Sequence, residues 1–195
     1  MEKKITEITF NEAFEVAKKQ HTLGLIPQAV YVYKQIIATD INHAEAWHYL
    51  GVAEHQQGNH QQGIECIQKS LEIAPENLEA QYNLATIFQL IHKEDEAEKL
   101  FHSVLAVNPV YPEVYFNLGI IAQEKGAIEA AEKHYLQAIE QNNQMAAAWY
   151  RLGSLYQEND TEKARKYFKK SAVLDVRYLN YFKEKGIDLR DKKEE

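Results

Sequence analysis

The chain has 195 residues, of which 45% are hydrophobic and 26% charged, which is enough for one or two domains with a packed core. Its formal net charge of -7 argues against electrostatic attraction to nucleic acid, and no apolar run approaches the ~18 residues of a membrane-spanning helix. The single cysteine, Cys66, excludes an internal disulfide. No apolar stretch follows the basic residues after Met1, so we expect no secretory signal and a cytoplasmic location.

A first helical pair is predicted after a short lead of residues 1–9. Apolar residues recur at helical spacing from Phe14 onward, and Gly24 marks the end of this first helix. Pro27 then begins the second helix, the usual arrangement of a C-terminal glycine followed by an N-terminal proline. This pair forms the predicted unit 10–43.

A skeleton of apolar and small residues then returns at a period of 34 residues. The recurring pairs are Leu50-Gly51, Leu84-Ala85, Leu118-Gly119 and Leu152-Gly153. A fixed period of this size is the signature of a solenoid, in which each unit buries its apolar face against its neighbours. The following units are predicted at 44–77, 78–111, 112–145 and 146–178, so the array covers residues 10–178.

Two turns between helices depart from the pattern. The third unit has His92-Lys93-Glu94 where the second unit has Gly58-Asn59, so its turn lacks the glycine. In the fifth unit Ala164 comes one residue early relative to Gly153, which predicts a turn that is one residue short.

Small residues predict where the two helices of a unit touch. The small residues of the first helices are Gly51, Ala85, Gly119 and Gly153, and we expect them to face Ala29, Gly63, Ala97, Ala131 and Ala164 of the second helices. A larger side chain would hold the backbones apart, and such overpacking typically costs ~1–3 kcal/mol.

The repeat register ends after residue 175. Tyr178, Tyr181 and Phe182 lie at positions i, i+3 and i+4, which predicts an amphipathic helix that caps the last helix of the array. Residues 179–195 are predicted to be the end of this helix and a solvated, charged tail.

This skeleton resembles the tetratricopeptide repeat. Trp47 and Trp149 each precede a Leu-Gly pair at the family's spacing, and Pro75 and Pro109 close the second and third units. The first unit departs from the pattern, because it has Ala13 at the position of the tryptophan. The resemblance implies an all-α fold, a right-handed superhelix of five helix-turn-helix repeats with a C-terminal capping helix.

No catalytic motif stands out in the sequence. It contains no Gly-rich phosphate loop, no Ser or Cys nucleophile motif and no His-Glu-x-x-His. His21 and His55 are expected ~10 Å apart on neighbouring helices, too far to share a zinc ion with bonds of ~2 Å. Cys66 is expected to be a small packed side chain. We therefore predict a protein with no enzymatic activity, no catalytic residues, no metal site and no cofactor.

The resemblance implies that the first helices of the repeats line a concave groove. Three lanes of side chains along these helices are then expected to face a ligand, one of them aromatic or His and another His or Gln throughout. The candidate peptide-binding residues are His48, Tyr49, His55, Tyr82, Asn83, Gln89, Phe116, Asn117, Gln123, Tyr150 and Arg151. Amide side chains can bond a backbone N–H and C=O together, which suits an extended peptide.

Two known binding modes of the family place particular residues at these positions. Asn83 and Asn117 match the asparagine ladder of the superhelical array of O-linked N-acetylglucosamine transferase. The carboxylate clamp of co-chaperones is matched only by Asn117 and Arg151, so a clamp for a chaperone tail is not expected, although Arg151 can bind a single carboxylate. The acidic starts of the first helices, such as Glu45 and Glu79, are interpreted as favourable charges at positive helix N-termini.

The sequence thus predicts a scaffold or adaptor that binds an extended segment of a partner protein, without nucleic acid and without membrane insertion. Two alternatives remain open. The run from Ala13 to Pro75 is similar to bacterial arrays that precede a glycosyltransferase or sulfotransferase domain, so the chain would recruit substrate for a separate enzyme. The other alternative is self-assembly, as a homodimer paired through Tyr178, Tyr181, Phe182 and the terminal helices.

Overall fold

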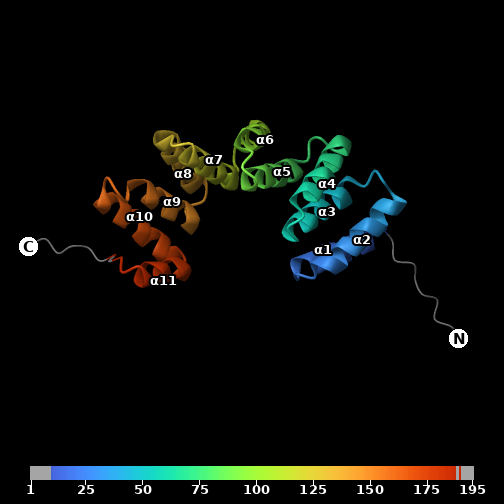
Figure 1. Ribbon diagram of the computed structural model, residues 1–195, viewed down its shortest axis with the longest axis horizontal. Helices are drawn as coiled ribbons and strands as arrows, with labels where there is room; N and C mark the ends of the chain where they lie inside the picture. The colour runs from blue at the N-terminus through green and yellow to red at the C-terminus, as the bar shows by residue number, and fades with distance from the viewer. Residues whose placement is uncertain (1–9, 188, 190–195) are drawn as a thin grey trace, which may run out of the picture. The chain divides into compact units, whose positions relative to one another are not determined.

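The computed structural model describes residues 10–187 and 189, so the predicted lead and the charged tail beyond residue 190 lie outside the described residues. Every regular element in this part of the chain is an α-helix (Figure 1), which confirms the all-α class. The helices are α1 Phe10–Thr22, α2 Ile26–Thr39, α3 Ala44–Gln56, α4 His60–Ile73, α5 Leu78–Leu90, α6 Glu94–Val107, α7 Pro112–Glu124, α8 Ile128–Gln141, α9 Ala146–Tyr156, α10 Thr161–Leu174 and α11 Val176–Glu184. None of these described helices is long and apolar enough to cross a membrane.

The helices form two compact units, Met1–Leu100 (unit 1) and Phe101–Glu195 (unit 2). Within unit 1, each helix from α1 to α4 packs against the helix that follows it in the chain. Helix α3 also contacts α1 and α5. Within unit 2, α7 to α11 pack in the same serial way, and α7 also contacts α9. Each unit is therefore built by neighbour-to-neighbour contacts, as a solenoid is.

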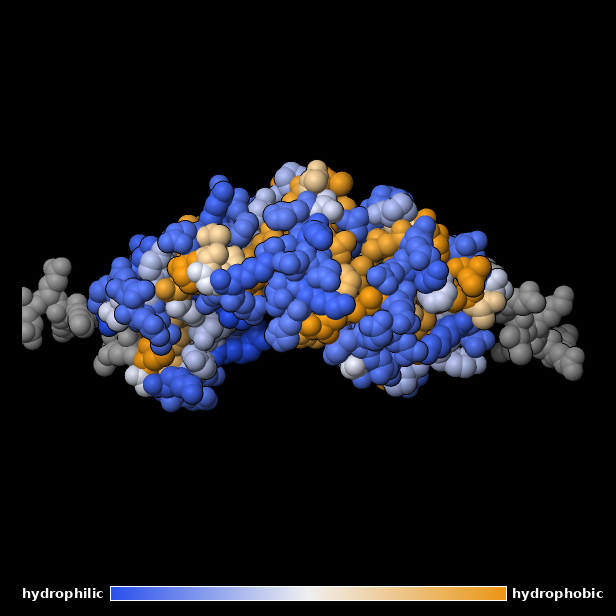
Figure 2. Space-filling view, turned by 45° about the horizontal axis from the view of Figure 1, so that its top comes forward, coloured by the Kyte–Doolittle hydropathy of each residue, from blue (hydrophilic) through white to orange (hydrophobic). Residues whose placement is uncertain are grey.

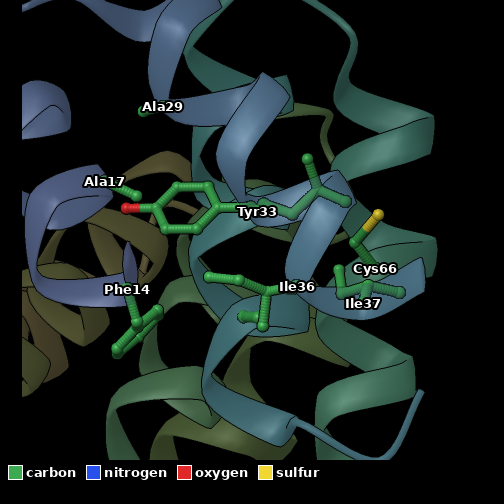
Figure 3. Packing of buried hydrophobic residues seen from close by; sticks show 9 residues of the cluster. Phe14, Ala17, Ala29, Tyr33, Ile36, Ile37 and Cys66 are labelled. Atoms are coloured by element: carbon green, nitrogen blue, oxygen red, sulfur yellow. The ribbon is translucent and has the colours of Figure 1, made fainter. Parts of the chain in front are cut away.

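The core of unit 1 surrounds Tyr33 of α2, which is fully buried. Figure 3 shows its ring beside Ala17 and Phe14 of α1, and the Tyr33 and Phe14 ring centroids are 6.0 Å apart. Ile37 and Cys66 lie together at another side of this cluster, where α2 meets α4. At the surface, Figure 2 shows hydrophilic side chains with hydrophobic residues exposed between them in both units.

The close approach of paired helices is visible at Gly51. A Cβ atom there would lie 2.7 Å from the carbonyl oxygen of Gly63 and 2.5 Å from Cγ1 of Ile67, so the backbones of α3 and α4 touch as the sequence predicted. In unit 2 a Cβ at Gly153 would meet the Phe168 ring at 2.6 Å and the carbonyl oxygen of Ala164 at 3.2 Å, and a Cβ at Gly119 would first meet the ring of Tyr135 on α8, at 2.5 Å. A flat aromatic ring fills the space that glycine leaves there.

The turns between the helices of the first four pairs each contain a residue with left-handed backbone. Gly58 has a φ of 86° in the turn before α4, and the glycine-free turn of the third unit is made by His92 with a φ of 58°. The fifth unit differs from the expectation, because its shortening falls on helix α9, which already ends at Tyr156, and not on the turn. Asp160 then caps α10 by accepting a hydrogen bond from the backbone N–H of Lys163 at 2.9 Å.

At one repeat position, a side-chain hydrogen bond closes the loop that enters α3, α5 and α9. The side-chain N–H groups donate to backbone carbonyls, from Trp47 Nε1 to Ile41 at 2.8 Å, from Gln81 Nε2 to Pro75 at 2.7 Å and from Trp149 Nε1 to Asn143 at 3.0 Å. Glutamine thus replaces tryptophan because both side chains supply the same donor.

Helix α11 packs on the end of unit 2, as the predicted capping helix should. Its Phe182 is buried, and the ring centroid lies 4.9 Å from that of Phe168 on α10. The ring of Tyr178 stacks on Tyr150 of α9, also at 4.9 Å. The cap therefore covers both helices of the last pair, not the second helix alone.

Candidate binding surface

The first helices of each pair lie side by side and form one face in each unit. We call this the A face; it consists of α1, α3 and α5 in unit 1 and of α7 and α9 in unit 2. The candidate residues are distributed over it as His48, Tyr49 and His55 on α3, Tyr82, Asn83 and Gln89 on α5, Phe116, Asn117 and Gln123 on α7, and Tyr150 and Arg151 on α9. All of them are partly exposed except His48, which is 1% exposed.

His48 and Asn83 form a polar pair between α3 and α5. The Nδ2 atom of Asn83 lies 2.8 Å from Nε2 of His48. Burial lowers the pKa of His48 to about 4, and the charge of His21 lowers it further. The imidazole is therefore neutral at neutral pH, and its Nε2 accepts a hydrogen bond from the Asn83 amide.

Tyr49 lies among aromatic rings next to this pair. Its ring centroid is 5.0 Å from that of His48 and 5.6 Å from that of Phe14, which it meets edge to face. The Nζ atom of Lys18 lies 5.1 Å from the Phe14 ring and 6.0 Å from the Tyr49 ring, and it pairs with Glu15 at 2.6 Å. The sequence interpretation missed Lys18, although it stands one helical turn after Phe14 and so shares its side of α1.

In the lane of His and Gln residues, which includes His21, His55 and Gln123, these three side chains are hydrogen-bonded to other side chains of the protein. The hydroxyl of Tyr135 donates to Oε1 of Gln123 at 2.7 Å, and Nδ1 of His55 lies 2.9 Å from Nδ1 of His60. In unit 1 the hydroxyl of Tyr33 approaches His21 Nδ1 at 3.4 Å, over the same 12-residue separation as in the Tyr135–Gln123 pair. A tyrosine at that separation is the sequence signal that would have revealed these bonds.

The aromatic lane in unit 2 is partly covered. Tyr150 stacks on Tyr178, and the Tyr181 ring meets it edge to face at 5.8 Å, so α11 shields much of its ring. Arg151 lies close enough to Tyr135 that its positive charge opposes the rise in the pKa of that buried hydroxyl, a rise caused by burial. Within the described residues, no carboxylate is paired with Arg151. Its guanidinium is the positive group that the A face of unit 2 presents.

A cavity that the sequence interpretation missed lies on the other side of unit 1, between α2, α3 and α4. Its volume is about 620 Å³, and Cys66 and Glu54 are among its lining residues. The Glu54 side chain is buried and accepts hydrogen bonds from Lys34 Nζ at 2.8 Å and from Asn59 Nδ2 at 2.9 Å. Burial, together with the negative charge of Glu54, raises the pKa of the Cys66 thiol to about 11, so the thiol is an inert packed group at neutral pH.

No group of three His, Cys, Asp or Glu side chains that could hold a metal ion occurs within residues 10–187. The A faces present partly exposed amides, aromatic rings and the Arg151 guanidinium. Such groups make hydrogen bonds and stacking contacts to another molecule.

The serial helix pairs and the A face define a helical-repeat protein of the protein-binding class. Models of the tetratricopeptide repeat match residues 42–109, 93–146 and 122–175. Together these matches cover more than half of the sequence, and the chain belongs to the tetratricopeptide repeat family.

Among curated proteins, the PEX5-related protein of Mus musculus is 33% identical over 100 residues, which are 51% of this chain and 18% of that protein. The PEX5-related protein of Homo sapiens is 30% identical over 99 residues, 51% of this chain and 16% of that protein. The chain thus matches less than a fifth of the length of either relative.

Solved structures share the fold over most of their length. A MamA structure has a TM-score of 0.72 and 25% identity, and the match covers 85% of this chain and 98% of MamA. YrrB, a TPR protein described as having an unusual peptide-binding site, has a TM-score of 0.69 and 18% identity, with 93% and 94% covered. MamA from Desulfovibrio magneticus RS-1 has a TM-score of 0.75 and 18% identity, with 86% and 96% covered.

Proposed function

We propose that this protein is a non-enzymatic scaffold or adaptor that binds an extended segment of a partner protein on its A faces. The observation that carries the proposal is the pair of amides at one repeat position, Asn83 on α5 and Asn117 on α7, both partly exposed. An amide side chain can donate to a backbone C=O and accept from a backbone N–H at once, which recognises extended backbone without regard to its sequence.

The surroundings of the amides favour a peptide ligand. Tyr49 next to Asn83 presents an aromatic ring that can pack against a side chain, and Arg151 in unit 2 can pair with a carboxylate of the partner. The family and the fold shared with YrrB, which has a peptide-binding site, are compatible with this function. The partner is therefore expected to supply an extended segment with an acidic group.

The test requires a ligand of known sequence. Peptides of about 12 residues, long enough to cross the A face of one unit, are selected from a random displayed library against the wild-type chain. The affinity of the best peptide is then measured by titration calorimetry for wild type, Asn83→Ala and Asn117→Ala. We expect Asn83→Ala to weaken the binding of a peptide held by unit 1, or Asn117→Ala that of a peptide held by unit 2, about tenfold, the loss that one hydrogen bond of about 1.4 kcal/mol produces.

The matched control is Gln35→Ala, which removes an exposed amide from α2, outside the A face. It should leave the affinity unchanged. Unchanged affinity in both asparagine variants, with helicity intact by circular dichroism, would overturn the assignment of the A face as the binding surface.

Self-assembly is a second candidate, which is supported by exposed apolar residues near α11. Val173 and Val176 are 77% and 62% exposed, and Tyr181 lies at the surface of the same end of unit 2. If this patch pairs two chains, sedimentation over a range of concentrations should show a dimer for the wild-type chain and a monomer for Val173→Glu. A monomer at every concentration would exclude it.

Recruitment of a substrate for a separate glycosyltransferase or sulfotransferase is a special case of the proposed adaptor. It predicts that adding this chain to such an enzyme raises kcat/KM for a protein substrate, and that the purified chain alone transfers no sugar or sulfate. Transfer by the chain alone would contradict the non-enzymatic assignment.

A further inference from the structure

We infer that His48 is a positioning residue that fixes the amide plane of Asn83, so that Asn83 presents one N–H and its carbonyl oxygen to the partner's backbone. This inference rests on the proposed function and explains how the A face of unit 1 prepares its main polar contact. It also replaces the expected role of His48 as a direct peptide contact with an indirect one, because the ring has almost no surface to offer.

The first step is the count of hydrogen bonds around the Asn83 amide. Its NH2 group has two hydrogens, and one of them is directed to Nε2 of His48 at 2.8 Å. The other hydrogen and Oδ1 are not used by this bond. They are the two groups that a peptide N–H and C=O can engage together, so the bond to His48 uses none of the partner-binding capacity.

The second step concerns what holds His48 itself. The ring is 1% exposed, and it packs at 5.0 Å against the Tyr49 ring, so it has no freedom to rotate into solvent. Burial keeps the imidazole uncharged at neutral pH, and because the amide nitrogen of Asn83 can only donate, Nε2 is the unprotonated ring nitrogen that accepts. Asn83 is then bonded to an immobile group and loses its rotamer freedom before the partner arrives, which lowers the entropic cost of binding.

The third step is a comparison within unit 1 that separates this role from a purely structural one. Phe14 on α1 stands at the repeat position of His48, and it meets Tyr49 on α3 over the same chain separation that joins His48 to Asn83. An aromatic pair therefore satisfies the packing of this position one repeat earlier. A ring nitrogen at His48 is not required by the fold, and its bond to Asn83 adds orientation.

The bond can be observed without any ligand. In long-range ¹H–¹⁵N spectra of the labelled chain at pH 7, His48 Nε2 should be unprotonated, and one Asn83 side-chain amide proton should be shifted downfield by its bond. His48→Phe should abolish that downfield shift, and His48→Gln, whose Oε1 can accept the same bond, should restore it. A protonated Nε2, or two Asn83 amide protons without any such shift in wild type, would overturn the inference even if the His48→Phe variant failed to fold.

The functional test uses the selected 12-residue peptide described above. We expect His48→Phe to weaken its binding about fivefold and His48→Gln to restore it to within about twofold of wild type, because only the acceptor is exchanged. The matched control, His102→Phe, changes an exposed histidine on α6, which is not part of the A face, and should have no effect.

The outcomes separate the inference from the proposed function. If Asn83→Ala and Asn117→Ala leave the affinity unchanged, the proposed function fails. If Asn83→Ala weakens binding but a folded His48→Phe binds like wild type, the positioning role of His48 alone is overturned. Weakening by His48→Phe without rescue by His48→Gln would likewise assign the loss to packing and contradict the inference.

Discussion

Equivalent positions in the two units carry very different side chains on the side away from the A face. The seventh residue of α4 is Cys66, which borders a cavity of about 620 Å³, whereas the seventh residue of α10 is Tyr167. The Tyr167 ring lies 5.9 Å from that of Trp149 and 6.1 Å from that of Tyr156. An aromatic cluster thus occupies in unit 2 the place that is hollow in unit 1.

The residue facing this place differs as well. Glu54 of α3 is buried and charged, and the corresponding residue of α9 is Tyr156, whose ring lies 3.6 Å from Nζ of Lys163. Lys34 binds Glu54 in unit 1, and Lys163 binds Glu132 in unit 2 at 3.2 Å. The repeat therefore determines how its helices approach each other, but the space between second helices accepts a thiol, a carboxylate or a ring.

Helix contact is the feature in which the units should differ most on mutation. Gly51→Ala pushes against backbone atoms of Gly63 and Ile67, whereas the atoms nearest to a Cβ at Gly119 belong to the side-chain ring of Tyr135, which is easier to displace than backbone. We expect Gly51→Ala to lower the free energy of unfolding by about 3 kcal/mol and Gly119→Ala by about 1 kcal/mol. Urea unfolding followed by circular dichroism measures both, and equal losses would show that α3 and α4 can separate as easily as a ring can tilt.

Exchanging the side chains of Cys66 and Tyr167 tests whether the cavity of unit 1 can hold an aromatic ring. Tyr167→Cys removes two ring contacts and should cost about 2 kcal/mol, whereas Cys66→Tyr should cost less than about 1 kcal/mol because the cavity can accept the ring. Thermal unfolding of both single variants and of the double exchange compares them. A Cys66→Tyr variant that loses as much as Tyr167→Cys would mean that the cavity has the wrong shape for a ring.

Replacing the buried carboxylate of Glu54 should give the smallest loss of stability of the three tests, and this loss should depend on pH. Burial raises the pKa of Glu54, but hydrogen bonds from Lys34 and Asn59 and the charge of Lys34 outweigh it, so the net pKa lies below the ordinary 4.5. A carboxyl whose pKa is lower in the folded state stabilises the fold above pH 4.5 and loses this contribution as the pH falls through its folded pKa. Glu54→Gln should therefore cost about 1 kcal/mol at pH 7 and progressively less below about pH 4.

Its control is an exposed ion pair that borders the same cavity. Glu72 pairs with Lys69 at 2.5 Å, and both side chains are exposed. Glu72→Gln should change stability by no more than a few tenths of a kcal/mol, roughly the value of a surface pair. A cost of Glu54→Gln that stays constant between pH 7 and acid would contradict the assignment of the ionised form as the stabilising one.

The fold was predictable because it depends on residues that recur. Leu50-Gly51 and its copies fixed the helix pairs, and the close approach of α3 to α4 at Gly51 is present in the structure. The turn at His92 shows how the period survives a lost glycine, since histidine can adopt the left-handed φ of 58°. Periodicity could not show the filling of Gly119 by Tyr135, because that contact depends on the shape of one ring.

The candidate surface was predictable only as a set of helix positions. The repeat positions of His48 and Gln123 predicted that both side chains contact a ligand. In the structure, His48 is hydrogen-bonded to Asn83 and Gln123 to Tyr135. Tyr150 is partly covered by α11, a helix outside the repeat register. The position of a residue in a lane predicts the direction of its side chain on its own helix. The exposure of that side chain depends on which neighbouring side chains contact it.

Helix α11 has a practical consequence for redesign of this molecule. Because Phe182 closes over Phe168 while Tyr178 lies on Tyr150, a module fused directly after Leu174 would have to displace this helix and take over the sheltering of both rings. Lengthening the chain by an extra module in the loop before Ala146 leaves that seal intact. An extra repeat inserted before Ala146 therefore keeps the contacts of α11 that an extension directly after Leu174 would break.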